Sequence, residues 1–352
     1  MKIGILTFHS VYNYGAVLQA MALQRFLLNL NLGDVELINY EVEDFKKLYS
    51  LNPFYGGIKM TLQRLFGIKE RYSQAKVFDS FIRDNLLQTR PLQLGELPDY
   101  LQKYDAIVYG SDQIWNTVLT QDDGVYFGEY TPINIREISY AASFGTDICN
   151  SVQREKIRTY LRKFYRISVR ERQGIEYIRK EIDNSVELVV DPVFLLNRKY
   201  WETLCENCYP INKPYILYYS LQHNEELINR TNRLAETNNL KIICIHPTAR
   251  KQRIGGIQLY DVGPIEFLSL IKGAEIICTN SFHAVAFSLI LNKKVLQVNH
   301  SKSKSRINNL LTLLELNEQE YSEVIDFSKV NVQRLAQIVE DSKSFLKISL
   351  IN

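Results

Sequence analysis

Short apolar segments alternate along the chain with segments whose apolar residues recur at helical spacing. Residues 2–8 form an apolar run that ends in polar residues, which is typical of a buried parallel strand. Residues 16–30 carry apolar side chains at helical spacing, and residues 35–40 form a second apolar run. A strand, a helix and a strand in this order predict a βαβ unit with a right-handed connection.

The alternation resumes after a less regular stretch at residues 45–100, in which 58–67 and 73–87 have a helical pattern. We expect strands at residues 105–109, 136–140, 166–170 and 186–190 and, in a second set, at 214–219, 241–245, 275–279 and 294–298. We expect helices at residues 152–164, 173–182, 225–238, 264–272, 282–291, 304–314 and 328–346.

Two successive sets of alternating strands and helices predict an α/β protein with two Rossmann-like domains that face each other. Because Asp191-Pro192 stops the last strand of the first set, we expect the boundary between residues 191 and 213. We predict an N-terminal domain at 1–195, a C-terminal domain at 196–327 and a C-terminal helix at 328–352. Open parallel sheets bind ligands outside the carboxyl ends of their strands, so the active site is expected in the cleft between the domains.

Composition and charge exclude several classes of protein. The chain has 352 residues and a formal net charge of +3, which is too small to predict nucleic-acid binding by bulk electrostatics. Its five cysteines are an odd number, which argues against a disulfide framework. Cys205 and Cys208 form a single CxxC pair without the second pair that a zinc site needs, so no metal site is expected.

The N-terminus runs directly into the first predicted strand, and no apolar run approaches the length of a membrane-spanning helix. We therefore expect a cytoplasmic protein. A peripheral position at the inner face of the membrane stays open, since a lipid-linked substrate requires no transmembrane helix.

Polar side chains stand where the first predicted helix begins. Asn13 and Tyr14 precede Gly15 and the helical segment. The N-terminus of a helix offers unpaired N–H groups, which suit an anion or a sugar hydroxyl. A simple capping turn is the alternative.

Two further loops of the first domain follow buried strands. Ser111, Asp112 and Gln113 follow the strand at 105–109, and Asp112 either orients or deprotonates a hydroxyl or caps a short helix. Ser143 stands among small residues that permit close approach of a ligand or, equally, tight packing.

Two arginines end another predicted strand. On a strand, Arg170 and Arg172 would point the same way and could hold a carboxylate or a phosphate. The alternative is an internal ion pair between Glu171 and a neighbouring arginine.

The second domain contributes a histidine and a basic loop. His283 follows Asn280 and Ser281 at the first turn of an apolar helix, where it could transfer a proton. Lys304 and Arg306 alternate with serines before the next helix, which favours anion binding over a merely solvated loop. 

Together these segments resemble the polysaccharide pyruvyl transferase family. The resemblance rests on the motifs at residues 13–20 (NYGAVLQA), 110–116 (GSDQIWN), 140–145 (YAASFG), 168–172 (SVRER), 191–193 (DPV), 263–268 (GPIEFL) and 280–283 (NSFH). The resemblance covers most of the chain, and it depends on the order and spacing of the motifs together.

The resemblance implies a glycosyltransferase-B-like fold and an enzyme that transfers a pyruvyl group from phosphoenolpyruvate to two hydroxyls of a sugar, forming a cyclic ketal and releasing phosphate. The acceptor would be a glycan of a bacterial surface polysaccharide, such as a capsule or exopolysaccharide, or its lipid-linked oligosaccharide precursor. The resemblance further implies that His283 and either Arg170 or Arg172 belong to the donor site. Some members carry arginine where this chain has Ser281, so Lys304 or Arg306 would complete that site here.

We therefore assign hypothetical roles to the candidates. His283 and Asp112 are the predicted catalytic residues, and no cofactor is expected. The predicted donor-binding residues are Arg170, Arg172, Asn280, Ser281, Lys304 and Arg306. The predicted acceptor-binding residues are Asn13, Tyr14, Ser111, Gln113 and Ser143. The main alternative is a sugar-nucleotide-dependent glycosyltransferase of the same fold, and a non-catalytic glycan- or flavin-binding subunit is another.

Overall fold

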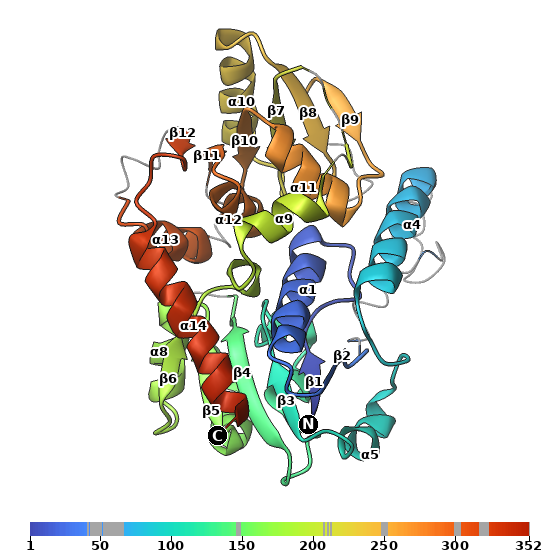
Figure 1. The fold of residues 1–352 in the computed structure, drawn as a ribbon, viewed down its shortest axis with the longest axis vertical. Helices are drawn as coiled ribbons and strands as arrows, with labels where there is room; N and C mark the ends of the chain where they lie inside the picture. The colour runs from blue at the N-terminus through green and yellow to red at the C-terminus, as the bar shows by residue number, and fades with distance from the viewer. Residues whose placement is uncertain are drawn as a thin grey trace.

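The computed structural model describes residues 1–40, 42, 51, 67–145, 149–206, 208–209, 211, 213–247, 253–298, 304–316 and 324–351, with the side chains of residues 304 and 305 excepted. The helix expected at 58–67 lies outside these residues except for Gly67, which is in a turn. Two six-stranded sheets form two layered bodies, one above the other in Figure 1.

The first sheet is parallel throughout and has the strand order β2-β1-β3-β4-β5-β6. Its strands are β1 (Lys2–Leu6), β2 (Asp34–Leu37), β3 (Ala106–Tyr109), β4 (Arg136–Ala142), β5 (Arg166–Val169) and β6 (Val186–Leu188). The longer helices of this part of the chain are α1 (Tyr14–Asn29), α4 (Ile68–Asn85), α7 (Ser151–Tyr160) and α8 (Arg172–Arg179), and the short ones are α5 (Leu97–Leu101) and α6 (Thr117–Thr120). Strand β3 is buried along its whole length and β4 is buried after its first residue, because helices cover both faces of a parallel sheet.

The second sheet has the order β12-β11-β10-β7-β8-β9, with only β12 antiparallel to its neighbour. Its strands are β7 (Tyr215–Tyr219), β8 (Lys241–Ile245), β9 (Ile257–Leu259), β10 (Ile276–Thr279), β11 (Lys294–Gln297) and β12 (Val324–Asp326). Its helices are α9 (Arg198–Leu204), α10 (Glu225–Thr237), α11 (Pro264–Gly273), α12 (Phe282–Ile290) and α13 (Lys304–Leu313), followed by α14 (Gln333–Ile351). The sequence pattern missed β9 and β12, because each has only three residues and β9 is partly exposed.

The last helix crosses back to the first sheet. In Figure 1, α14 runs from the upper body down along the lower one. Its Ser342 Oγ accepts a hydrogen bond from Val190 N at 3.0 Å, and its Leu350 carbonyl accepts one from Arg136 at 3.1 Å. In the opposite direction, Gln74 of α4 donates to the carbonyl of Pro247 at 3.1 Å. Segments from each half of the chain therefore stabilise the other half.

Tyr14 at the start of α1 joins the two bodies directly. Its ring stacks on Phe267 of α11 with centroids 4.3 Å apart and an interplanar angle of 3°. Its hydroxyl donates to the carbonyl of Val262 at 2.9 Å. Because the side chain is 1% exposed, the N-terminal end of α1 is fixed against the second domain.

Tyr14→Phe tests this contact. The substitution keeps the stacked ring and leaves the buried Val262 carbonyl without its donor, so we expect the free energy of unfolding to fall by about 1 kcal/mol. Urea denaturation measures the change, and Tyr72→Phe at an exposed position of α4 is the control. Equal stability of Tyr14→Phe and the wild type would contradict the assigned contact.

Candidate active site

The candidate site lies where loops at the carboxyl ends of the first sheet meet the N-terminal turn of α12 from the second domain. The Asp191 carboxylate, just after β6, is at its centre and is 1% exposed. Its Oδ2 accepts a hydrogen bond from Arg170 Nη1 at 2.6 Å and lies 3.4 Å from His283 Nε2 and 3.5 Å from Ser111 Oγ. Its Oδ1 accepts from Val193 N at 3.1 Å. This one carboxylate thus contacts groups from both domains.

The charges around Asp191 keep it ionised. Burial by itself raises the pKa of Asp191, but His283 and Arg170 together hold that pKa well below the usual carboxyl range. Asp191 therefore supplies a permanent negative charge in a site from which water is excluded.

Arg170 is already bound by carboxylates. Its Nε donates to Glu171 Oε1 at 3.0 Å, its Nη1 donates to Asp191, and its Nη2 lies 4.0 Å from Asp112 Oδ1. Burial lowers the pKa of the Arg170 guanidinium, but these three carboxylates raise it above its ordinary value. The internal ion pair with Glu171 is therefore present, and Arg170 serves first to balance buried negative charge.

The prediction that Arg170 and Arg172 extend together from one strand is wrong. Strand β5 ends at Val169, Glu171 is the N-cap of α8, and Arg172 is the first residue of that helix. Arg172 is exposed, since the chain turns away from the sheet between the two arginines.

His283 lies between the two domains. Its Nε2 faces Asp191 at 3.4 Å, which is longer than an ordinary hydrogen bond. Its Nδ1 occupies the space next to Gly15 in the first turn of α1, 2.0 Å from where a Cβ on Gly15 would stand. The imidazole thus lies between a carboxylate on one side and the N-terminal end of the 16-residue helix α1 on the other.

Several predicted acceptor residues are buried and hydrogen-bonded within the protein. Tyr14 lies in the domain contact described above. Ser111 and Ser143 are each 0% exposed, and their hydroxyls donate to the carbonyl of Ala141 and to Glu171 Oε1, both at 2.9 Å. These three residues hold the site in place, and their expected direct contact with an acceptor is not supported by their burial.

Asn13, Asp112 and Gln113 remain partly accessible. Asn13 is the N-cap of α1 and accepts from Ala16 N at 3.2 Å. The side chain of Asp112 is 14% exposed. Asp112 does not cap a helix, because Asn116 caps α6. Asp112 has a φ of 66°, and a residue other than glycine in this left-handed conformation is found most often at functional sites.

The remaining donor candidates differ in what surrounds them. Asn280 binds the backbone of Leu221 and Gln222, and Ser281 caps α12 by accepting from Ala284 N at 3.4 Å. Lys304 begins α13, and its side chain lies outside the described part of the structure.

Arg306 is half-buried. Burial, and next the positive charge of Arg170, lower the pKa of its guanidinium, while nearby carboxylates oppose them. No carboxylate within the described ranges forms an ion pair with Arg306.

Sequence reasoning missed the roles of Asp191 and Glu171. In the sequence, Asp191 marks the end of a strand and Glu171 is a candidate ion-pair partner, and both lie in motifs that resemble the family, but neither pattern assigns them a place in the site. Both follow strands of the parallel sheet at its carboxyl edge, the same signal that selected Asp112.

The described part of the chain gathers no three His, Cys, Asp or Glu side chains in the arrangement that a metal ion needs. No helix within the described ranges combines the length and apolar composition that crossing a membrane requires.

Known structures with similar folds are sugar-nucleotide enzymes. UDP-GlcNAc 2-epimerase from Neisseria meningitidis bound to UDP-GlcNAc is 11% identical, with 100% of both chains covered and a TM-score of 0.53. A putative UDP-N-acetylglucosamine 2-epimerase from Listeria monocytogenes is 9% identical over 98% of this chain and 94% of that one, with a TM-score of 0.52. An alpha-glucosyltransferase in complex with UDP and a 13-mer DNA is 8% identical over 99% and 96%, with a TM-score of 0.50. The protein thus has the α/β glycosyltransferase-B fold, as predicted.

A family model described as polysaccharide pyruvyl transferase matches residues 13–302. The chain therefore belongs to the polysaccharide pyruvyl transferase family, which confirms the resemblance of its motifs. No curated protein matches the chain at a significant level.

Gly15→Ala tests the position of His283. The added methyl group would lie 2.0 Å from Nδ1, so the imidazole must move, and we expect a loss of about 1–3 kcal/mol in stability. Thermal unfolding and the ¹⁵N signals of the imidazole measure the loss and the displacement. Gly95→Ala is the control, because a Cβ there meets nothing within 4 Å. Unchanged imidazole signals in Gly15→Ala would contradict the assigned packing.

Asp191→Asn tests the buried charge cluster. Removing one partner of a buried ion pair leaves Arg170 partly uncompensated, so we expect the free energy of unfolding to fall by about 3 kcal/mol at neutral pH. Because the pKa of Asp191 is lowered in the folded protein, the difference from wild type should persist down to about pH 4 and shrink at lower pH. Urea titrations at a series of pH values measure this. Asp99→Asn at an exposed position should change stability little, and an equal effect of the two substitutions would refute the cluster.

Proposed function

We propose that this protein transfers the pyruvyl group of phosphoenolpyruvate to two hydroxyls of a sugar, forming a cyclic ketal and releasing phosphate. The observation that carries the proposal is the approach of His283 to Asp191 across the two domains, with Arg306 near enough to interact with the same carboxylates by charge, in a chain of the polysaccharide pyruvyl transferase family.

Arg306 is the cation best suited to hold the donor. Phosphoenolpyruvate carries a carboxylate and a phosphate, and a guanidinium can bind either with two parallel hydrogen bonds. Arg170 is engaged by Glu171 and Asp191, whereas Arg306 has no ion pair with a carboxylate in the described ranges. Arg306 thus takes the place of the arginine that some family members carry at the position of Ser281. 

The proposed reaction balances as follows. A proton adds to the methylene carbon of phosphoenolpyruvate, and the first sugar hydroxyl forms a bond to the central carbon. The central carbon–oxygen bond to phosphate breaks, with the electron pair leaving on phosphate, and the second hydroxyl forms the other ketal bond. Of the two hydroxyl protons, one replaces the proton given to the methylene carbon and the other leaves with phosphate.

His283 is the residue proposed to move these protons, with Asp112 orienting or deprotonating a sugar hydroxyl. The central carbon becomes electron-poor during the reaction, and fixed negative charge nearby stabilises such a centre. Asp191, Glu171 and Asp112 supply that charge around Arg170. No metal ion or cofactor takes part in the proposed steps.

The proposed acceptor is a sugar of a bacterial capsule or exopolysaccharide, or its lipid-linked oligosaccharide precursor. Phosphoenolpyruvate is a cytoplasmic metabolite, so the reaction is placed in the cytoplasm, and at the inner face of the membrane when the acceptor is lipid-linked.

His283→Ala tests the proton-transfer role. With phosphoenolpyruvate and a panel of oligosaccharide acceptors, we expect phosphate release and ketal formation by the wild type and at least a 100-fold lower kcat for the variant. Phosphate release and mass spectrometry of the glycan measure both products. His223→Ala, at a half-exposed histidine that pairs with Glu225, is the matched control. Near-full transfer by His283→Ala would refute this assignment.

Arg306→Ala tests donor binding. Loss of the guanidinium should raise the KM for phosphoenolpyruvate about tenfold or more, which corresponds to about 1.4 kcal/mol of lost binding, with a smaller change in the KM for the acceptor. Arg179→Ala, at an exposed position of α8, is the control. Thermal stabilisation by UDP-sugars but not by phosphoenolpyruvate would instead favour a sugar-nucleotide-dependent glycosyltransferase.

A further inference from the structure

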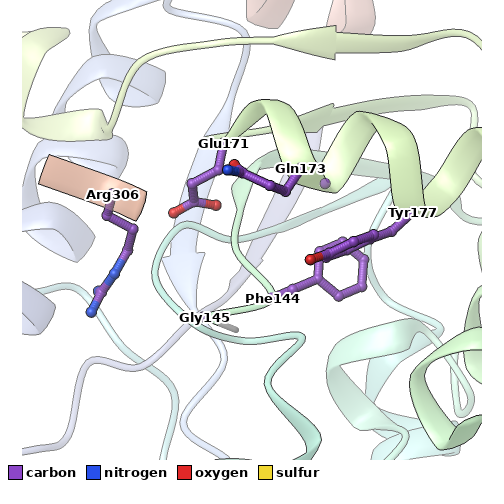
Figure 2. A pocket seen from close by; sticks show the side chains of 7 residues that line it. Phe144, Gly145, Glu171, Gln173, Tyr177 and Arg306 are labelled. Carbon is purple, nitrogen blue, oxygen red and sulfur yellow. The ribbon is translucent and has the colours of Figure 1, made fainter. Parts of the chain in front are cut away.

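A small pocket opens beside the charge cluster, on the side facing α8 and α13. It encloses about 240 Å³ of space that is open to solvent, and its lining includes Phe144, Gly145, Glu171, Gln173, Tyr177 and Arg306. Figure 2 shows Glu171, Gln173 and Tyr177 along one helix and its first turn, with Arg306 from a different helix on the opposite side of the view from Tyr177. Most of this space lies at the open mouth, so the interior accepts one hydroxyl or another small group, and a larger ligand lies across the mouth.

Glu171 presents an unused acceptor to this pocket. The residue is 7% exposed, and its Oε1 accepts hydrogen bonds from Arg170 Nε at 3.0 Å and from Ser143 Oγ at 2.9 Å. No donor within the described ranges bonds to its Oε2, which keeps contact with solvent. A ligand hydroxyl in the pocket can therefore replace water as the donor to this oxygen.

Two aromatic rings form the apolar wall. Tyr177 and Phe144 pack edge to face, with centroids 5.5 Å apart and an interplanar angle of 86°. Tyr177 is half-buried, and Figure 2 shows its ring lining the pocket on the side away from Arg306. The pocket thus has aromatic rings on one side and the polar side chains of Glu171 and Arg306 on the other. Such a lining suits a ligand that has an apolar face and hydroxyl groups around its edge.

The charges of the lining select the class of ligand. The lining combines the Glu171 carboxylate with the Arg306 guanidinium, which is proposed to hold the donor anion. Beside that guanidinium, Glu171 favours a neutral ligand with hydroxyl donors, such as a sugar ring, over a second anion. We propose that this pocket marks the acceptor subsite, in which one neutral hexose ring lies across the pocket mouth against Tyr177 and one of its hydroxyls enters the pocket and donates a hydrogen bond to Glu171 Oε2.

This inference rests on the proposed function and adds to it where the acceptor lies. The Arg170 guanidinium joins Glu171 to Asp191, which lies beside His283. A hydroxyl held at Glu171 is therefore connected through one guanidinium to the proposed proton-transfer pair. Arg306 lines the pocket and is close enough to Arg170 for their charges to interact, so donor and acceptor would meet beside it.

Substitutions of Tyr177 test the subsite by kinetics. We expect Tyr177→Ala to raise the KM for the glycan acceptor about tenfold and to leave the KM for phosphoenolpyruvate within about twofold. Tyr177→Phe, which keeps the ring, should lie much closer to the wild type. Tyr165→Ala, at a half-exposed tyrosine elsewhere on the first domain, is the matched control. An unchanged acceptor KM in Tyr177→Ala, or a rise confined to the KM for phosphoenolpyruvate, would overturn the proposal.

Ligand binding without turnover supplies the second test. Saturation-transfer NMR with methyl glucoside, methyl galactoside and methyl mannoside should show contact between at least one of them and the wild type, and that signal should vanish in Tyr177→Ala. Glu171→Gln should weaken the signal, and thermal unfolding of the same sample shows whether the variant is folded. Equal signals from wild type and folded Tyr177→Ala, or loss of the glycoside signal in direct competition with phosphoenolpyruvate, would overturn the subsite.

The two measurements separate this inference from the proposed function. A Tyr177-dependent glycoside signal without any pyruvyl transfer from phosphoenolpyruvate would support the sugar subsite and refute the proposed reaction. Pyruvyl transfer with a Tyr177-independent acceptor KM would support the reaction and refute the subsite.

Discussion

The burial of Asp191 between Arg170 and His283 is the interaction on which the rest of the site depends. A carboxylate with 1% exposure is tolerated only when it is paired and hydrogen-bonded, and here the partners come from both domains. The first domain supplies Asp191 and Arg170, and the second supplies His283. The site is therefore complete only while the two domains are in contact.

The contacts that join the two domains also position the residues of the site. Tyr14 fixes the start of α1 against α11, which brings Gly15 of the same turn against the His283 ring. Helix α14 crosses back over the first sheet and binds the backbone at Val190, next to Asp191. The packing that holds the domains together thus also positions the imidazole and its carboxylate partner.

The distribution of charge gives the two arginines different tasks. Arg170 is neutralised by carboxylates and organises the buried cluster, whereas Arg306 lines an open pocket without an ion pair to a carboxylate in the described ranges. The chain belongs to the polysaccharide pyruvyl transferase family, and the two α/β bodies of the glycosyltransferase-B fold surround this cluster. The proposed pyruvyl transfer uses both arginines. Arg170 balances the buried carboxylates of the protein, and Arg306 binds the negative charge of the donor.

The sequence by itself determined the two sets of strands and helices, the family and the loops that meet in the site, because apolar periodicity and motif order are local properties of the chain. It also identified His283, Asp112 and Arg306 as candidates. It could not show that Arg172 turns away from Arg170, because one residue decides where β5 ends and α8 begins. Nor could it show that Tyr14, Ser111 and Ser143 are buried, or that Asp191 pairs with His283. Those facts depend on contacts between segments far apart in the chain, and only the tertiary packing of the two domains brings them together.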